Sequence, residues 1–134
     1  MIVLDTSSII DFLKGDKRLA EIVENAEKKG EPIAVASVSL FELLTPTYHK
    51  SMPQKEELLR SFLHNLMVLP LDARASEESA KIMGSLLKIG KPTKVLDSII
   101  AGTAFSNGAS ALITKDKEFE HVRLVSPLSV EILS

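Results

Sequence analysis

The chain opens with the stretch MIVLDTSS, residues 1–8. Its apolar run is short and rich in β-branched residues, which favours a β-strand. The run stops at Asp5, and the Thr-Ser-Ser cluster that follows supplies side chains able to cap the N-terminus of a helix. Apolar residues at Ile9 and Leu13 continue with helical spacing until Gly15 ends the helix. A buried strand followed at once by a capped helix predicts the first unit of a parallel sheet.

The same alternation of apolar strands and helices recurs along the whole chain. Four further strands are predicted, at residues 33–36, 67–69, 111–113 and 124–125. Helices are predicted between and around them, at residues 16–30, 37–48, 52–66, 72–90, 93–107 and 117–121. Pro46 is expected to kink or end its helix. Strands that are apolar on both faces and separated by helices indicate a three-layer α/β/α sandwich around a short parallel sheet of about five strands. No linker or repeat divides the sequence, so residues 1–134 are expected to form a single domain.

The composition excludes several classes of protein. The 134 residues carry 16 Lys and Arg against 18 Asp and Glu, a net charge of −2, so nucleic-acid binding has to rest on a local basic patch. The absence of cysteine excludes disulfides, zinc ribbons, thiol nucleophiles and iron–sulfur clusters. The sequence contains no signal-like segment and no apolar run of membrane-spanning length. We therefore expect a small, soluble, cytoplasmic protein with no membrane partner.

Four acidic residues are predicted near one edge of this sheet. Ligands of open parallel sheets bind beyond the carboxyl ends of the strands, and Asp5 and Asp116 follow the first and fourth strands. Glu42 lies in the first turns of the helix after the second strand. Asp97 opens a helix with a stripe of small residues, an apolar setting where an ionised carboxylate is rarely buried unless it is paired or coordinated. Each residue alone also fits as a cap, a turn residue or a favourable charge at a helix N-terminus. Only their combination favours a shared site.

Four motifs spread in order over nearly the whole chain, VLDTSS, SVSLFEL, LDSIIAGTA and LITKD, resemble the acidic motifs of PIN-domain ribonucleases. Among these proteins the chain is most similar to the VapC-like toxins of VapBC toxin–antitoxin pairs. The resemblance implies a PIN-like fold with a metal site. Its carboxylates would be those of Asp5, Glu42, Asp97 and Asp116. Three hydroxyl groups would support them, those of Thr6, Ser7 and Thr114.

The chemistry of four clustered carboxylates fits the nuclease activity of this family, and the resemblance adds the role of a toxin. They cannot all stay ionised without a cation, because like charges raise one another's pKa. Oxygen ligands without His or Cys favour Mg²⁺, for which Mn²⁺ can substitute. Such an ion lets a phosphodiester approach, activates water and stabilises the leaving oxygen. We expect a metal-dependent endoribonuclease that hydrolyses RNA, the toxin of a type II toxin–antitoxin system. The resemblance further implies a homodimer and a cognate antitoxin.

Two other functions remain open at this point. A receiver-like phosphoacceptor module is also an α/β fold with an Asp after its first strand. It expects adjacent acids beside Asp5 and a phosphoacceptor at the end of the third strand, where Asp72 fits better as a helix cap. A PIN fold that has lost catalysis would act as an interaction scaffold, and the presence of all four acids argues against that.

Three basic clusters are candidates for contact with RNA, although a solvated helix face explains each of them more simply. They are Lys14 with Lys17 and Arg18, His49 and Lys50 beside Tyr48, and Lys88 with Lys91 and Lys94. A single Tyr and no Trp do not support extensive base stacking, which favours recognition of the backbone or of RNA shape.

A groove for a partner protein is a further candidate feature. Ile9, Phe12, Leu13 and the helices between Leu43 and Leu63 would line it, and an amphipathic helix would fit there. The alternative is that these residues simply form core.

Overall fold

The computed structural model describes residues 1–134 and contains a five-stranded sheet in which all neighbouring strands are parallel. The strand order is β3-β2-β1-β4-β5. The strands are β1 (Ile2–Leu4), β2 (Ile33–Ala36), β3 (Met67–Leu69), β4 (Ala111–Thr114) and β5 (Val130–Ile132). Because β1 is central, its carboxyl end lies between the corresponding ends of β2 and β4. The segments that carry the predicted acids therefore start side by side.

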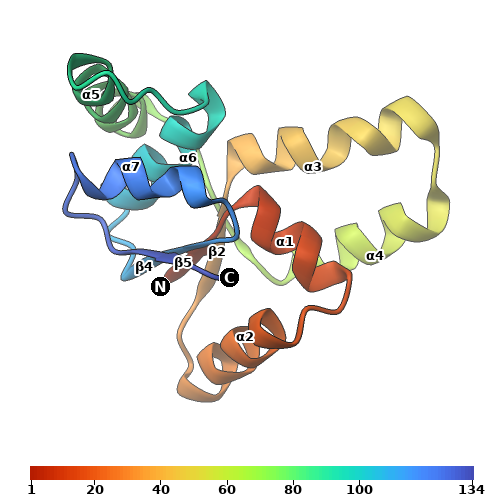
Figure 1. Ribbon diagram of the computed structural model, residues 1–134. Helices are drawn as coiled ribbons and strands as arrows, with labels where there is room; N and C mark the ends of the chain where they lie inside the picture. The colour runs from red at the N-terminus through yellow and green to blue at the C-terminus, as the bar shows by residue number, and fades with distance from the viewer.

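Helices cover both faces of the sheet (Figure 1). One face is covered by α1 (Thr6–Leu13), α2 (Lys17–Lys29), α3 (Ser37–Lys50) and α4 (Pro53–His64). The other is covered by α5 (Ala73–Lys88), α6 (Val95–Ser106), the 3₁₀ turn η1 (Lys117–Phe119) and α7 (Glu120–Arg123). This arrangement confirms the predicted three-layer α/β/α sandwich. No helix is both long enough and apolar enough to span a bilayer.

Two apolar cores explain why the strands carry apolar residues on both faces. Side chains alternate along β1, so Val3 enters the core under α5 and α6 while Ile2 and Leu4 enter the core under α1 to α4. On β4, Leu112 and Ile113 divide in the same way. A sheet that is buried on both faces is a rigid support for the loops at its carboxyl end.

The position of the fifth strand differs from the prediction. Leu124 and Val125 form a turn that closes α7, with backbone bonds to His121 and Val122, and Leu124 is exposed. The strand lies at Val130–Ile132 instead, where it pairs with the Leu112–Thr114 segment of β4. The apolar residues at 124–125 continue the helical run that precedes them, and for such short runs periodicity cannot separate a helix end from a strand.

Pro46 does not end α3, which continues to Lys50. The ring removes one backbone donor from the helix. Threonine hydroxyls on both sides of the proline donate to carbonyls of the preceding turn, Thr45 to Phe41 at 2.6 Å and Thr47 to Leu44 at 2.7 Å. The carbonyl that loses its donor is that of Glu42, and the threonine bonds go to neighbouring carbonyls. The helix continues past the proline, and α3 and α4 extend side by side beyond the sheet (Figure 1).

A close contact between α5 and α6 fixes the helix that carries Asp97. Gly102 of α6 packs directly on Ser79 of α5, and a Cβ at Gly102 would overlap both the backbone and the side chain of Ser79. Ala101 and Ala104 are fully buried against the sheet, as the stripe of small residues predicts. The small residues therefore bring α6 close to both neighbours and hold its first turn at the carboxyl edge of the sheet.

Candidate metal centre

Asp5 lies directly after β1 and caps α1. Its Oδ1 accepts hydrogen bonds from the Ser8 backbone N–H and the Ser7 hydroxyl, both at 2.8 Å, and its Oδ2 accepts one from Thr114 Oγ1 at 2.6 Å. The side chain is buried, and burial raises the pKa of its carboxyl group, although bonds from Thr114, Ser8 and Ser7 favour the ionised form. Asp5 is thus both a cap and a carboxylate at the carboxyl edge.

The hydroxyls of Ser7 and Thr114 tie the segment after β4 to Asp5. The Lys115 backbone N–H donates to Ser7 Oγ at 3.1 Å, and the Asp116 backbone N–H donates to Thr114 Oγ1 at 2.9 Å. Both hydroxyls in turn donate to Asp5. The start of the turn that carries Asp116 is therefore held against the end of β1. The two hydroxyls lie where a supporting role requires them.

Asp97 is the carboxylate of this group whose surroundings most disfavour the ionised form. It lies in the first turn of α6 and is 9% exposed, and its Oδ2 is buried without a hydrogen-bond partner. Burial, and next the charges of Asp116 and Asp5, raise the pKa of Asp97 to about 7, whereas Lys94 opposes the rise. Such a group is stable in ionised form only if a cation offsets these charges.

Glu42 reaches the same region from α3. Thr6 Oγ1, at the start of α1, lies 2.6 Å from Glu42 Oε1 and donates a hydrogen bond to it. Ser39 Oγ lies 3.1 Å from the same threonine hydroxyl. The negative charge of Glu42 also contributes to the raised pKa of Asp97, so the two carboxylates share one electrostatic environment. The predicted acids from four separate segments therefore converge.

Asp116 brings with it an acid that the sequence analysis did not identify. One carboxylate oxygen each from Asp97, Asp116 and Glu118 lie within 4.8 Å of one another. Asp116 Oδ1 accepts a hydrogen bond from the Glu118 backbone N–H at 2.9 Å, which caps η1. The sequence signal was an acid two residues after a capping Asp, which by itself is typical of a solvated turn.

The donor set fits a hard divalent cation. All of the converging side chains offer oxygen, and no His or Cys is among them, which is the chemistry of Mg²⁺ and Mn²⁺ sites. The buried, unpartnered Oδ2 of Asp97 is the local observation that requires a compensating group.

Comparison with known proteins identifies the family. The PIN domain family model matches residues 2–124. The chain belongs to the PIN domain family. The tRNA(fMet)-specific endonuclease VapC of Shigella flexneri is 29% identical over 121 residues, 90% of each chain. A chain in the structure of VapBC-1 from nontypeable Haemophilus influenzae is 25% identical and aligns over 98% of both chains with a TM-score of 0.81. A chain in the structure of VapBC2 from Rickettsia felis bound to promoter DNA is 23% identical, with a TM-score of 0.87 over both full chains.

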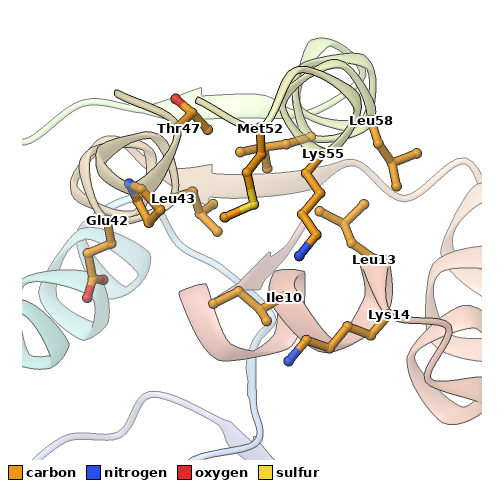
Figure 2. Close-up of a pocket in the computed structure, with 11 residues that line it drawn as sticks. Ile10, Leu13, Lys14, Glu42, Leu43, Thr47, Met52, Lys55 and Leu58 are labelled. Carbon is orange, nitrogen blue, oxygen red and sulfur yellow. The ribbon is translucent and has the colours of Figure 1, made fainter. Parts of the chain in front are cut away.

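This PIN domain also carries an apolar groove of about 340 Å³ between α1, α3 and α4. Aliphatic side chains line most of it, among them Ile10, Leu13, Leu43, Met52 and Leu58 (Figure 2). Lys55 extends into this space from α4 and Lys14 borders it on α1, while the carboxylate of Glu42 points away from it (Figure 2). The groove therefore combines an apolar floor with two cations.

The groove differs in part from the one predicted. Leu13 and Leu43 line it. Ile9 is instead fully buried in the core, and the ring of Phe12 stacks on that of Phe62, with ring centroids 4.6 Å apart. The apolar pattern of α1 could not tell core residues from groove residues, because this helix packs on the sheet and borders the groove at the same time.

Proposed function

We propose that this PIN domain is a Mg²⁺-dependent endoribonuclease and the toxin of a toxin–antitoxin pair. The observation that carries the proposal is the convergence of carboxylates around the buried, unpartnered Oδ2 of Asp97. Its relative from Shigella flexneri is a tRNA(fMet)-specific endonuclease, and the structural neighbours come from VapBC complexes. RNA is the substrate class that this relationship supports.

The site residues have distinct proposed roles. Asp5, Asp97, Asp116 and Glu42 together form the acidic site that would take Mg²⁺, or Mn²⁺ in its place. An ion bound there would supply a nucleophilic water at neutral pH and would stabilise charge on the leaving oxygen. Ser7 and Thr114 orient Asp5 and the Asp116 turn through the bonds described above. Thr6 holds Glu42 in one rotamer.

Recognition of the RNA backbone is assigned to basic side chains near this edge. Lys94 is close enough to Asp97 to influence its pKa, so it is placed to contact a phosphate next to the scissile bond. Lys115 is a different case, since its ammonium group pairs with Asp16 at 2.9 Å and is not free for RNA. Contacts from the other two predicted basic clusters stay predictions.

The groove is the proposed docking site for the antitoxin. An amphipathic helix from that partner would place apolar side chains against Leu13, Leu43 and Leu58 and acidic side chains opposite Lys14 and Lys55. Leu58→Asp is expected to abolish partner binding while RNA cleavage continues. Leu87→Asp is the matched control, because Leu87 is similarly exposed on α5. Equal partner binding by the two variants would contradict this placement.

We also propose a homodimer. Phe41 on α3 and Val95 on α6 are each 65% exposed, large apolar side chains that a second copy would cover. Sedimentation equilibrium of the wild type and of Phe41→Asp tests this. A dimer that the substitution dissociates is expected, and a monomeric wild type would contradict the proposal.

The receiver-like alternative is disfavoured by the structure of the third strand. Asp72 caps α5, with its Oδ1 accepting from the Ala75 backbone N–H at 2.8 Å, so it is engaged in helix capping rather than free as a phosphoacceptor. Labelling with acetyl phosphate provides a direct check, and we expect none.

The test of the function is cleavage of a pool of structured RNA and single-stranded DNA with Mn²⁺, Mg²⁺ or EDTA. Wild type is expected to cleave RNA only with metal, and Asp97→Asn is expected to lose that activity. Glu120→Gln is the control, because Glu120 is an exposed acid outside the cluster. Equal cleavage by wild type and Asp97→Asn would refute the assigned site. A wild type that neither cleaves RNA nor binds Mn²⁺ would favour the inert scaffold.

A further inference from the structure

We propose that Glu118 is a direct ligand of the cation held by Asp97 and Asp116. The inference rests on the proposed metal site and names one of its ligands. The inner group of carboxylates would then come from α6 and the turn after β4, and Glu42 of α3 would not be the third member. This assignment differs from the set of four acids to which the sequence motifs point.

The distances between the three carboxylates suit one small divalent ion. One oxygen from each lies within 4.8 Å of the others. Opposite ligands of an octahedral Mg²⁺ lie about 4.2 Å apart, twice the metal–oxygen distance of about 2.1 Å. Adjacent ligands lie about 3.0 Å apart, so oxygens at the 4.8 Å limit close by up to about 1.8 Å when they bind one ion. The exposed side chain of Glu118 can supply that movement by a change of rotamer.

A second observation shows that this cluster lacks a positive partner. Asp97 is 9% exposed, its Oδ2 accepts no hydrogen bond, and it forms no ion pair. Buried carboxylates in proteins are normally paired or coordinate a metal. The unpartnered group therefore points to a cation as the missing component, next to the carboxylates of Asp116 and Glu118.

The backbone holds Glu118 beside Asp116. The Glu118 N–H donates to Asp116 Oδ1, which leaves Asp116 Oδ2 free to bind a cation. The next residue, Phe119, is fully buried and anchors the turn in the core. The Glu118 carboxylate itself takes part in no hydrogen bond or ion pair, so nothing else in the chain competes for it.

Glu42 is engaged differently. Its Oε1 accepts the 2.6 Å hydrogen bond from Thr6, and its carboxylate, like that of Asp5, lies outside the group within 4.8 Å. A negative charge at this place still influences Asp97. Glu42 therefore suits an outer position, where a carboxylate acts through orientation and charge, and Glu118 suits the inner one.

The experiment is a calorimetric titration of the metal-free protein with Mn²⁺, which does not depend on catalysis. Wild type is compared with Glu118→Gln and with Glu120→Gln, a matched loss of one exposed carboxylate two residues along the chain. Loss of a residue that merely supports a metal ligand costs about 10–100-fold in affinity, so loss of a direct ligand is expected to weaken Mn²⁺ binding at least about tenfold. Glu120→Gln is expected to bind within about twofold of wild type, because an exposed charge outside the cluster contributes little.

The outcomes separate this inference from the proposed function. Wild-type Mn²⁺ affinity in Glu118→Gln, together with lost binding in Asp97→Asn, would overturn the role of Glu118 and leave the metal site intact. Equal weakening by Glu118→Gln and Glu120→Gln would also overturn it, since general charge would then explain both. No Mn²⁺ binding by the wild type would refute the metal site and the inference together.

Discussion

Replacing Asp97 with asparagine is expected to stabilise the metal-free protein at alkaline pH. Burial and the neighbouring acids raise the pKa of Asp97 from 3.8 to about 7 in the folded chain. A carboxyl group whose pKa is higher in the folded chain than in the unfolded chain destabilises the folded state at every pH at which it is ionised. Its cost to the folded state is therefore absent below about pH 4, grows as the pH rises and is complete above about pH 7.

The size of the effect follows from the pKa and from what asparagine adds. A rise from 3.8 to about 7 corresponds to at most about 4 kcal/mol, at about 1.4 kcal/mol per pH unit. Asparagine removes this cost, but its buried amide lacks hydrogen-bond partners, which destabilises the fold by about 1–3 kcal/mol. We expect a net gain of about 1–3 kcal/mol at pH 8. At pH 4.5 the cost removed is only about 1 kcal/mol, so the gain disappears.

The assay is urea unfolding in EDTA at pH 8 and pH 4.5, with Glu120→Gln as the control for the loss of an exposed acid. Adding Mn²⁺ should reverse the order at pH 8, because the ion stabilises the wild type and not Asp97→Asn. A variant that is destabilised equally at both pH values would contradict the raised pKa of Asp97, since ionisation of this carboxyl group would then not destabilise the fold.

Two further substitutions test the framework around the site. Gly102→Ala is expected to destabilise the fold by about 1–3 kcal/mol, because the added methyl group overlaps Ser79; Gly84→Ala, with open space around it, should stabilise by up to about 1 kcal/mol in the same urea assay. Equal stability of the two variants would contradict the close packing of α5 on α6. Thr6→Val is expected to slow RNA cleavage while changing the urea midpoint little, because it releases Glu42; a cleavage rate equal to wild type would show that this hydrogen bond does not matter.

The layered fold could be predicted because its strands are short, apolar on both faces and separated by capped helices. Side-chain oxygens of Asp16 and Asp72 accept from Leu19 and Ala75, as helix-capping residues should. The fifth strand could not be placed in the same way. Its three residues gain their pairing only from β4, a contact distant in sequence that local pattern does not encode.

The sequence could predict which strand ends carry the acids of the site, but not how the carboxylates are placed relative to one another. Parallel strands meet at one edge, so Asp5 and Asp116 had to approach each other. The orientation of Glu42 could not be predicted, because Pro46 was expected to kink or end a helix that in fact continues to Lys50. Glu118 was missed because its proximity to Asp97, a residue more than twenty positions away in the sequence, arises from the tertiary fold and from no local motif.

The carboxylates of Asp97, Asp116 and Glu118 are proposed to form a divalent-cation site. The most direct measurement is a crystal structure of the protein grown with Mn²⁺, with anomalous data collected at the manganese absorption edge. We predict an anomalous peak in coordination range of carboxylate oxygens from Asp97, Asp116 and Glu118. A map with no peak among the carboxylates, from crystals whose mother liquor holds saturating Mn²⁺, would contradict the account.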